Sequence, residues 1–572
     1  MPLESAAAPA AQQSPSCSRV DRVASVCQVV DLEQARRARG ISLRGFAAEN
    51  DVPRSTLQDR VRAVQDDGLP EQWRPFLESE VGLAFVQRLL VSVLVVFVLR
   101  GGSSVELVAE FFEALHLRRL VATSPTSLRR VLSQVLEHTQ TWGQAQFARL
   151  APTMAPQDVV LALDENFHWR QMLLVAMDVA TGFVFCERSS ETRDGETWEK
   201  AVRESTTGFN VCLRAISRDG AEGLRHCATR LGVISGPDVF HLQCAVCKAT
   251  ARPMAQRVVR AQQAVEASKD ECAAVHAERE RDEAAPRGPG RPPDWDARER
   301  RAQAAVVSAE RHATTMAKER AAMQASIRAL GDAHHPVDLV TGEAVSAEQT
   351  RARIEHVVTE MQAQVERAGL GQRAAKALRA VIARQGDLAA IVAWWYQEVR
   401  RRLLSLSLPE GDVAWIIAVL VPALYVHRRI ELGRNENERT TLKALWASLR
   451  AKAMACTSPW STWSANQRQC VCDVVQSCVR MFPRSTSMLE GHNGQDSLCQ
   501  HQHHQLSEDF RKARIVVRNY VVQRADGTTA AERLFGGKPD DLIEHLCGRI
   551  KLPGRGRIRD GRPKPPALAL TG

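Results

Sequence analysis

Val159-Val160-Leu161-Ala162-Leu163-Asp164 is a run of five apolar residues that ends in a carboxylate. A short apolar run of this kind predicts a buried β-strand with Asp164 at its C-terminal tip. Two further apolar runs, Met172–Asp178 and Phe183–Cys186, flank the turn sequence Ala180-Thr181-Gly182. Together the three runs predict an antiparallel meander that opens a β-sheet.

The pattern continues with alternating helices and strands. A helix is expected near Thr197–Arg203, a fourth strand at Val211–Ile216, another helix after Asp219, and a fifth strand at Asp238–Leu242. The resulting order is β-β-β-α-β-α-β. Because mixed sheets place ligands at the carboxyl ends of strands, Asp164 and Asp219 are expected to approach each other across neighbouring strands.

A third acid lies far downstream, in Ser487-Met488-Leu489-Glu490-Gly491-His492-Asn493-Gly494, where Glu490 is predicted to open a helix. It is followed by Asp526-Gly527-Thr528-Thr529-Ala530-Ala531-Glu532-Arg533-Leu534-Phe535-Gly536. This succession resembles the end of a bacterial insertion-sequence transposase, and the upstream strands resemble the ribonuclease H-like core of DDE transposases and retroviral-type integrases. The resemblance extends from about residue 159 to 536, with a long interruption.

The resemblance implies a metal-dependent phosphoryl-transfer site. Asp164, Asp219 and Glu490 would hold two Mg²⁺ ions, or Mn²⁺, because hard cations favour oxygen ligands. The ions would activate a water or 3′-hydroxyl and stabilise the leaving oxygen, without a covalent protein intermediate. Asn493 lies three residues after Glu490 on the same helix face and would orient the Glu or contact phosphate. The partners implied are double-stranded DNA, both element ends and target, and further copies of the chain in a dimer or larger synaptic assembly.

Each acid also has a purely structural interpretation. An Asp at a strand end often caps a helix or forms a turn, and Asp178 fits this interpretation best. Glu490 taken alone would be an acid in the first turn of a helix, where the helix dipole favours a negative charge. Glu165 competes with Asp164 but should leave the strand on the opposite face. Asp238 competes with Asp219 but is expected to begin a strand. The ordered set of three acids favours the catalytic interpretation.

A second signal lies near the N-terminus, where the pattern of Ile41–Val61 predicts two short helices around a tight turn. Ser42 is expected to cap the first helix and Pro53 to occupy the first turn of the second. The segment resembles a helix-turn-helix. Its second helix would present side chains suited to phosphates and base edges in a major groove: Arg54, Ser55, Thr56, Gln58 and Arg60. A comparable pattern recurs at Ser103–Phe112 and Ser124–Leu132. A helical hairpin that only packs is the alternative.

Composition agrees with a nucleic-acid enzyme. The chain has 572 residues and a formal net charge of +10, and a basic excess favours polyanion binding. Fourteen cysteines in a chain of this length do not form a dense disulfide framework, and no secretory leader is evident, so a reducing cytoplasm and association with the nucleoid are expected. The most apolar run, Leu89–Leu99, is too short to span a bilayer, and no phosphate-binding loop indicates ATP.

The predicted fold class is α/β: a ribonuclease H-like mixed sheet with an N-terminal all-α helix-turn-helix region and a long helical insertion. The expected divisions are a disordered arm (1–30), a helical DNA-binding region (31–150), the first part of the catalytic core (155–243), the helical insertion (244–484), the part of the core with Glu490 (485–545) and a basic tail (546–572). The predicted function is transposition of the chain's own element. A non-catalytic DNA-binding derivative and a metal-dependent nuclease are the alternatives.

Overall fold

The computed structural model describes residues 36–553, except for 37, 50–68, 118–119, 169–170, 287, 289, 434, 485–486 and 504–505. The chain forms two compact units: one contains Met1–Met154 and Gln495–Gly572, and the other contains Ala155–Gly494. The boundary between Gly494 and Gln495 falls inside one helix, α21 (Ser487–His503). Each unit is described separately below.

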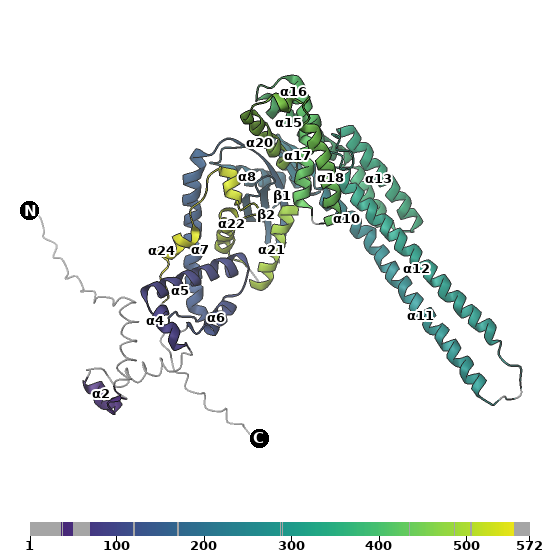
Figure 1. Ribbon diagram of the computed structural model, residues 1–572, viewed down its shortest axis with the longest axis horizontal. Coiled ribbons are helices and arrows are strands. Elements are labelled where there is room, and N and C mark those ends of the chain that lie inside the picture. Colours follow the sequence, from purple (N-terminus) through teal and green to yellow (C-terminus); the bar gives the residue numbers. More distant parts are fainter. Residues whose placement is uncertain are drawn as a thin grey trace, which may run out of the picture. The chain divides into compact units, whose positions relative to one another are not determined.

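The first unit is helical in its described part (Figure 1). Three serines cap successive helices, because Ser79, Ser104 and Ser124 each accept a hydrogen bond from a backbone N–H three residues on. Trp142 meets Tyr520 edge to face, and Tyr520 stacks on Phe535, so the two ends of the chain share one core. The main helices are α5 (Glu80–Val93), continued by η2 (Leu94–Arg100), α6 (Val105–Ala114), α7 (Pro125–Leu150), α22 (Glu508–Tyr520), α23 (Ala530–Phe535) and α24 (Leu542–Arg549).

The predicted helix-turn-helix is described only in its first half. Helix α2 (Leu43–Glu49) forms as expected, and Ser42 accepts a hydrogen bond from the Gly45 N–H at 3.2 Å, which confirms its predicted capping role. The predicted DNA-contacting residues lie outside the described residues: Arg54, Ser55, Thr56, Gln58 and Arg60. The later pair of helices, α6 and α7, forms as predicted and is in contact.

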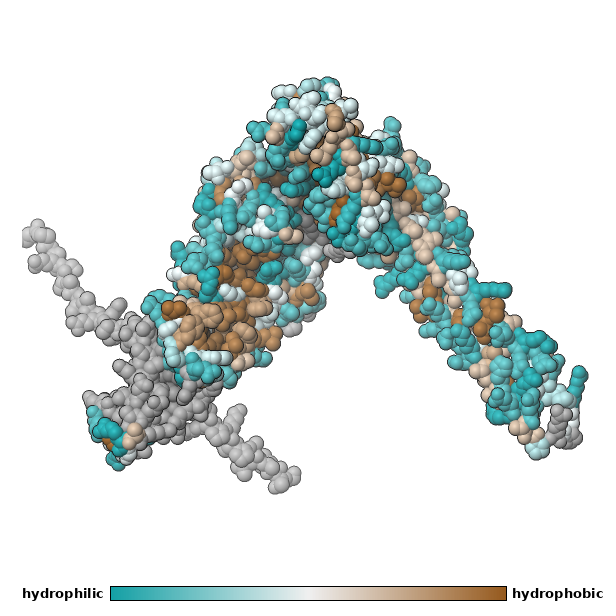
Figure 2. All heavy atoms as spheres, in the orientation of Figure 1, coloured by the Kyte–Doolittle hydropathy of each residue, from teal (hydrophilic) through white to brown (hydrophobic). Residues whose placement is uncertain are grey.

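Two helices are apolar and long enough to span a membrane by length and composition alone, Glu80–Arg100 and Glu410–Leu432. The first contains the Leu89–Leu99 run, which is therefore part of a longer helix than the run itself suggested. About half of each helix's apolar window is buried inside the protein, as in core helices. Figure 2 shows apolar surface over α5, η2 and α6, where the exposed side chains are Phe85, Val96, Phe97, Leu107 and Phe111.

The second unit is built on a five-stranded mixed sheet. The strand order is β3-β2-β1-β4-β5, with β1–β2 and β2–β3 antiparallel and β1–β4 and β4–β5 parallel. The α/β class predicted from the sequence is therefore observed as a mixed sheet, with the predicted order of elements. The strands are β1 (Gln157–His168), β2 (Gln171–Asp178), β3 (Val184–Ser190), β4 (Val211–Arg218) and β5 (Ile234–Pro237).

Two predicted details of the sheet are wrong. β1 continues past Asp164 to His168, because its last residues pair with β2 after the ladder to β4 has stopped at Leu163. The fifth strand is Ile234–Pro237 rather than Asp238–Leu242. Asp238 instead caps α10 (Val239–Ala249), since its carboxylate accepts a hydrogen bond from the Phe240 N–H.

Helices cover both faces of the sheet. On one face α8 (Gly195–Thr206) and α9 (Glu222–Leu231) bury Trp198, Leu224 and Cys227 against strand residues such as Leu161 and Leu163. On the other face Val160 and Ala215 pack with Met481 and Trp394. Successive residues of β1 therefore serve opposite layers, as the period of two requires.

The predicted helical insertion follows. Helices α11 (Ala251–Ala284) and α12 (Trp295–Asp332) form a long hairpin, seen as the teal pair in Figure 1. Arg279 ties the pair together through Glu299 at 2.7 Å and Asp296 at 3.0 Å. The hairpin lies within the helical insertion that was predicted for residues 244–484. The other helices are α13 (Ala347–Arg367), α14 (Gln372–Ile382), α15 (Gln385–Leu404), α16 (Glu410–Trp415), η5 (Ile416–Leu420), α17 (Val421–Leu432), α18 (Glu436–Ala453), α19 (Pro459–Thr462) and α20 (Ala465–Met481).

An aromatic core holds the later helices together. Trp395 is fully buried, donates its indole N–H to the Cys478 carbonyl at 2.8 Å and packs against Tyr425 and Phe482. Trp415 meets Trp463 edge to face at the rim of the same cluster. These aromatic residues therefore form part of the core of the insertion.

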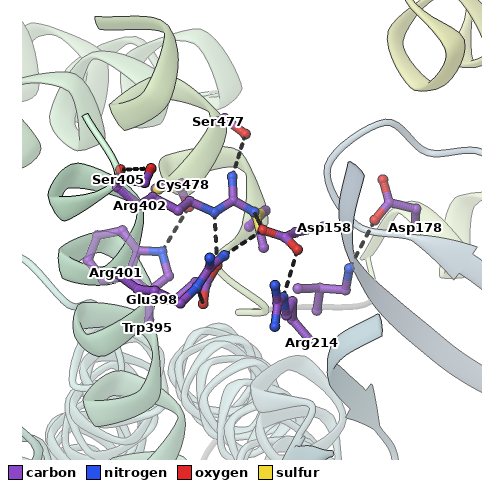
Figure 3. A network of polar contacts seen from close by, with 12 residues as sticks. Asp158, Asp178, Arg214, Trp395, Glu398, Arg401, Arg402, Ser405, Ser477 and Cys478 are labelled. Atoms are coloured by element: carbon purple, nitrogen blue, oxygen red, sulfur yellow. Dashed lines mark hydrogen bonds and ion pairs between the residues drawn. The ribbon is translucent and has the colours of Figure 1, made fainter. Parts of the chain in front are cut away.

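A network of charges fastens the insertion to the sheet (Figure 3). Asp158, near the start of β1, binds Arg214 of β4 at 2.7 Å and also Arg401 and Arg402 of α15 at 2.7 and 2.8 Å. Glu398 accepts hydrogen bonds from the same two arginines of α15. Because Asp158 and Glu398 are largely buried, the network fixes α15 against the N-terminal end of β1.

Candidate active site

The sheet register brings two of the predicted acids together. In the parallel β1–β4 ladder Leu163 pairs with Arg218, so the next residues along each strand are Asp164 and Asp219. β4 ends at Arg218, and the chain turns immediately, with Asp219 accepting a hydrogen bond from the Ala221 N–H at 2.7 Å. Asp219 therefore lies at a strand end as predicted, whereas Asp164 lies within β1 at the point where the β4 ladder stops.

Asp164 is buried and held on both of its carboxylate oxygens. The Glu165 N–H donates to Oδ1 at 2.9 Å, and the Asn493 side-chain Nδ2 donates to Oδ2 at 2.7 Å. Burial raises the pKa of Asp164 to about 6; the charges of Glu490 and Asp219 act in the same direction, and His241 opposes them. The sheet register and the Asn493 hydrogen bond therefore bring Asp219 and the helix that carries Glu490 to Asp164.

Helix α21 carries the third acid. Glu490 lies in its first turn, as predicted, and keeps 36% of its side chain exposed, so its carboxylate can reach solvent or a ligand. The neighbouring residues fix the helix against the sheet: Leu489 is fully buried, and His492 Nε2 lies 2.7 Å from Glu187 Oε2 of β3. α21 therefore presents Glu490 from a supported position.

Asn493 was predicted to orient Glu490 or to contact phosphate, but within the described residues its side-chain hydrogen bond goes to another acid. It crosses to β1 and binds Asp164, which is the acid of the other element. Its Oδ1 is buried without a hydrogen-bond partner among the residues described. An unsatisfied buried oxygen beside a carboxylate is a candidate contact for water or a hydrated ion.

His241 is a site residue that sequence reasoning missed. Its Nδ1 lies 2.9 Å from Asp238 Oδ2, and its Nε2 lies 3.4 Å from Glu490 Oε1. The hydrogen bond with Asp238 raises the pKa of His241 to about 9, against the effect of burial, and Asp164 and Glu490 add to the rise. The sequence does contain a signal for His241, because Asp238 is a good helix cap and the His follows it in the first turn. The signal was missed because Asp238–Leu242 was predicted to be a strand.

The competing acids have structural partners. Glu165 binds Arg193 at 2.8 Å on the opposite face from Asp164, as expected from strand alternation. Asp178 accepts hydrogen bonds from the Val160 N–H and from Thr181, which confirms its turn role. Asp238 follows β5 and orients His241, so it supports the site without belonging to the predicted set.

The donor set fits hard divalent cations in its chemistry. It offers oxygen from three carboxylates, and a buried Asp with a raised pKa gains from a nearby positive charge. Within the described part of the chain, the ligand atoms of the three acids do not all fall within 4.8 Å of one another. Within those residues the three acids therefore do not form one compact set of ligand atoms.

A cation also borders the Asp219 turn. A Cβ at Gly220 would lie 2.6 Å from the Arg384 guanidinium, so glycine allows this arginine to approach the backbone closely. Arg218, just before Asp219, is paired with Asp387 at 3.2 Å. The rim of the site beside Asp219 is therefore basic, which suits a phosphate substrate.

Part of the chain matches a known family model. Residues 416–562 match a family of unknown function, DUF6399. The matched segment includes Glu490, His492 and Asn493 but neither Asp164 nor Asp219. No curated protein matches the chain. The match therefore assigns no activity, and the case for function rests on the site itself.

Proposed function

We propose that this protein is a DDE-type transposase of a bacterial insertion sequence, whose second unit is a ribonuclease H-like phosphoryl-transfer domain. One observation carries the proposal: Asp164 and Glu490, 326 positions apart in the chain, lie on β1 and α21, which the hydrogen bond from Asn493 to Asp164 joins at 2.7 Å. Asp219 directly follows the β4 residue that pairs with Leu163 of β1. The element order β-β-β-α-β-α-β and the helical segment before Glu490 support it. The basic excess of the whole chain suits DNA as the substrate.

In this proposal the protein's side chains hold and orient the reacting groups. Asp164 and Asp219 form one pair of carboxylates across β1 and β4, and Asp164 and Glu490 form a second pair between β1 and α21. Asn493 orients Asp164, and His241 orients Glu490 while Asp238 holds the ring. Bound Mg²⁺ or Mn²⁺ would activate the attacking hydroxyl and stabilise the leaving oxygen.

DNA recognition would come from the first unit. We assign it to the segment that contains α2, where Arg54, Ser55, Thr56, Gln58 and Arg60 are the proposed contacts. The paired α6 and α7 would add a second contact region. Joining two ends implies a dimer or larger assembly on DNA, and the protein would act in the cytoplasm at the nucleoid.

The test uses DNA cut from either side of the gene, where an insertion sequence carries its ends. Labelled flanks are incubated with purified protein, a supercoiled plasmid and Mg²⁺, and the products are resolved as cut or joined strands. Joined products would support the transposase. Cutting without joining would favour a metal-dependent nuclease, and bound but intact DNA would favour a non-catalytic DNA-binding derivative.

A further inference from the structure

A cavity of about 320 Å³ lies beside the carboxylate site in the second unit. Phe240 and Leu489 line it, and these residues immediately precede His241 and Glu490. Ala162 also lines it, on the same face of β1 as Asp164. The size is at the lower end of small-ligand pockets, which span about 300–1,000 Å³.

The lining of the cavity is strongly basic. Arg428 and Arg429 of α17, Arg480 of α20 and Arg484 just beyond it all line the space. Arg428 and Arg429 have acidic neighbours, Glu431 at 3.0 Å and Glu438 at 3.4 Å; neither of these acids is among the lining residues. Guanidinium groups are well suited to binding phosphate oxygens in pairs.

Two of these arginines have unused donors. The Nε atoms of Arg429 and Arg484 are buried and have no hydrogen-bond partner in the described part of the chain. Arg484 makes one hydrogen bond with its Nη2, to the Gly331 carbonyl at 3.2 Å. Buried donors without partners are costly, so an anionic ligand that accepted from them would recover that cost.

Asp178 is a carboxylate on the cavity wall, and its oxygens already have hydrogen-bond donors. They accept hydrogen bonds from the Val160 N–H and from the N–H and hydroxyl of Thr181, so Asp178 closes the turn after β2. Four guanidinium groups and one carboxylate give the lining a positive charge.

Aromatic and apolar side chains also line the cavity. Phe240, which is 40% exposed, lies with Tyr425, Phe482 and Leu489 along the wall. The Tyr425 hydroxyl is already engaged with His335 Nδ1 at 2.6 Å, so the ring offers its apolar surface. A ligand that suits both kinds of lining residue contains a planar, apolar group and a phosphate.

We propose that this cavity binds a nucleoside monophosphate unit, with its phosphate among Arg428, Arg429 and Arg484 and its base against Phe240. The unit is either a free nucleotide or a nucleotide within a strand, since both present the same chemistry. The site is separate from the carboxylates, so it stands whether or not they catalyse phosphoryl transfer.

The test measures binding of adenosine monophosphate to the full chain in EDTA by calorimetry, beside inorganic phosphate as the simpler anion. We expect saturable nucleotide binding that is tighter than phosphate binding. Arg428→Gln should weaken nucleotide binding at least about tenfold, because charged hydrogen bonds are lost. Phe240→Ala should weaken nucleotide binding and leave phosphate binding unchanged. Arg373→Gln, an exposed arginine of α14 outside the cavity, is the matched control.

A short single-stranded oligonucleotide identifies the source of the unit. If the oligonucleotide displaces the mononucleotide, the cavity takes a nucleotide of a strand; if it does not, the cavity takes a free nucleotide. The proposal is overturned if folded wild-type protein shows no saturable nucleotide binding up to about 10 mM. It is also overturned if phosphate binds as tightly as the nucleotide, or if Arg428→Gln and Phe240→Ala leave binding unchanged.

Discussion

Asn493 of α21 donates a hydrogen bond of 2.7 Å to Asp164 of β1, although 329 positions separate the two residues in the chain. The contact joins the helix that carries Glu490 to the strand that carries the first acid. This hydrogen bond therefore constrains the distance between Asp164 and Glu490, two of the proposed metal ligands. Supporting hydrogen bonds of this kind orient carboxylates in metal sites.

Replacing Asn493 tests that constraint. Asn493→Ala should reduce metal-dependent strand cleavage by about 10–100-fold, as loss of a supporting hydrogen bond does in metal sites. Because the acids themselves remain, raising the Mg²⁺ concentration should restore part of the rate. The measurement is the initial rate across a Mg²⁺ titration, with Gln495→Ala on the same helix as the control. An unchanged rate and Mg²⁺ dependence would show that the contact has no role in the site.

Metal binding can be followed without any reaction. Mg²⁺ should raise the melting temperature of the wild-type protein, because a ligand that binds the folded state stabilises it. The rise should be absent in Asp164→Asn. Without Mg²⁺ at pH 8, Asp164→Asn should melt at a higher temperature than wild type, since burial disfavours the charged carboxylate whose pKa is raised to about 6. Equal shifts with Mg²⁺ in both proteins would place the ion elsewhere.

The network at Glu398 is predicted to stabilise the second unit. Burial raises the pKa of Glu398, but hydrogen bonds from Arg401 and Arg402 outweigh burial and lower it to about 2. Glu398→Gln should therefore cost roughly 3 kcal/mol of unfolding free energy at neutral pH, as breaking a buried ion pair does. Urea unfolding followed by tryptophan fluorescence measures it.

The pH dependence of this effect has a defined sign. A lowered pKa means that the stabilisation is complete above the ordinary glutamate pKa of 4.5 and is lost as the pH falls through about 2. The difference between wild type and Glu398→Gln should shrink across that window. Glu410→Gln, which breaks an exposed pair with Arg400, should change little at any pH. A constant difference across the window would contradict the ionic origin of the effect.

A substitution at Gly143 tests the packing of α7 against α22 in the first unit. A Cβ at this position in α7 would lie 2.7 and 2.9 Å from the two methyl carbons of Val516 in α22. Gly143→Ala should therefore destabilise the unit by about 1–3 kcal/mol through overpacking. Gly548→Ala is the control, because a Cβ there meets nothing within 4 Å. If both variants had the same melting temperature, the α7–α22 contact would be looser than the structure shows.

Local patterns predicted much of the second unit. The apolar runs predicted four strands, because buried strands need consecutive apolar residues on both faces. The fifth strand was predicted in the wrong place for two reasons. Ile234–Pro237 contains Gly and Pro and has no apolar alternation, and the short apolar stretch around Val239 and Leu242 was taken for a strand. Their spacing with Val246 is helical, and Asp238 is a cap.

The site could be predicted only in part. Asp164, Asp219 and Glu490 could be proposed from strand ends and a helix start, but their distances depend on packing between segments hundreds of residues apart. The position of His241 in the site and the Asn493–Asp164 contact depend on that packing. Local patterns of apolar and polar residues do not predict it. The arginine-lined cavity likewise combines α10, α17 and the end of α20, and the separate motifs give no sign that these segments meet.

The most direct test of the central claim is Mg²⁺-dependent strand cleavage by wild type and Glu490→Gln on the element's own flanking DNA. Glu508→Gln, an exposed acid in the first turn of the next helix, is the matched control. We predict cleavage and joining by wild type and by Glu508→Gln, and loss of both in Glu490→Gln with DNA binding retained. Cleavage at the wild-type rate by Glu490→Gln would contradict a catalytic site built on Asp164, Asp219 and Glu490.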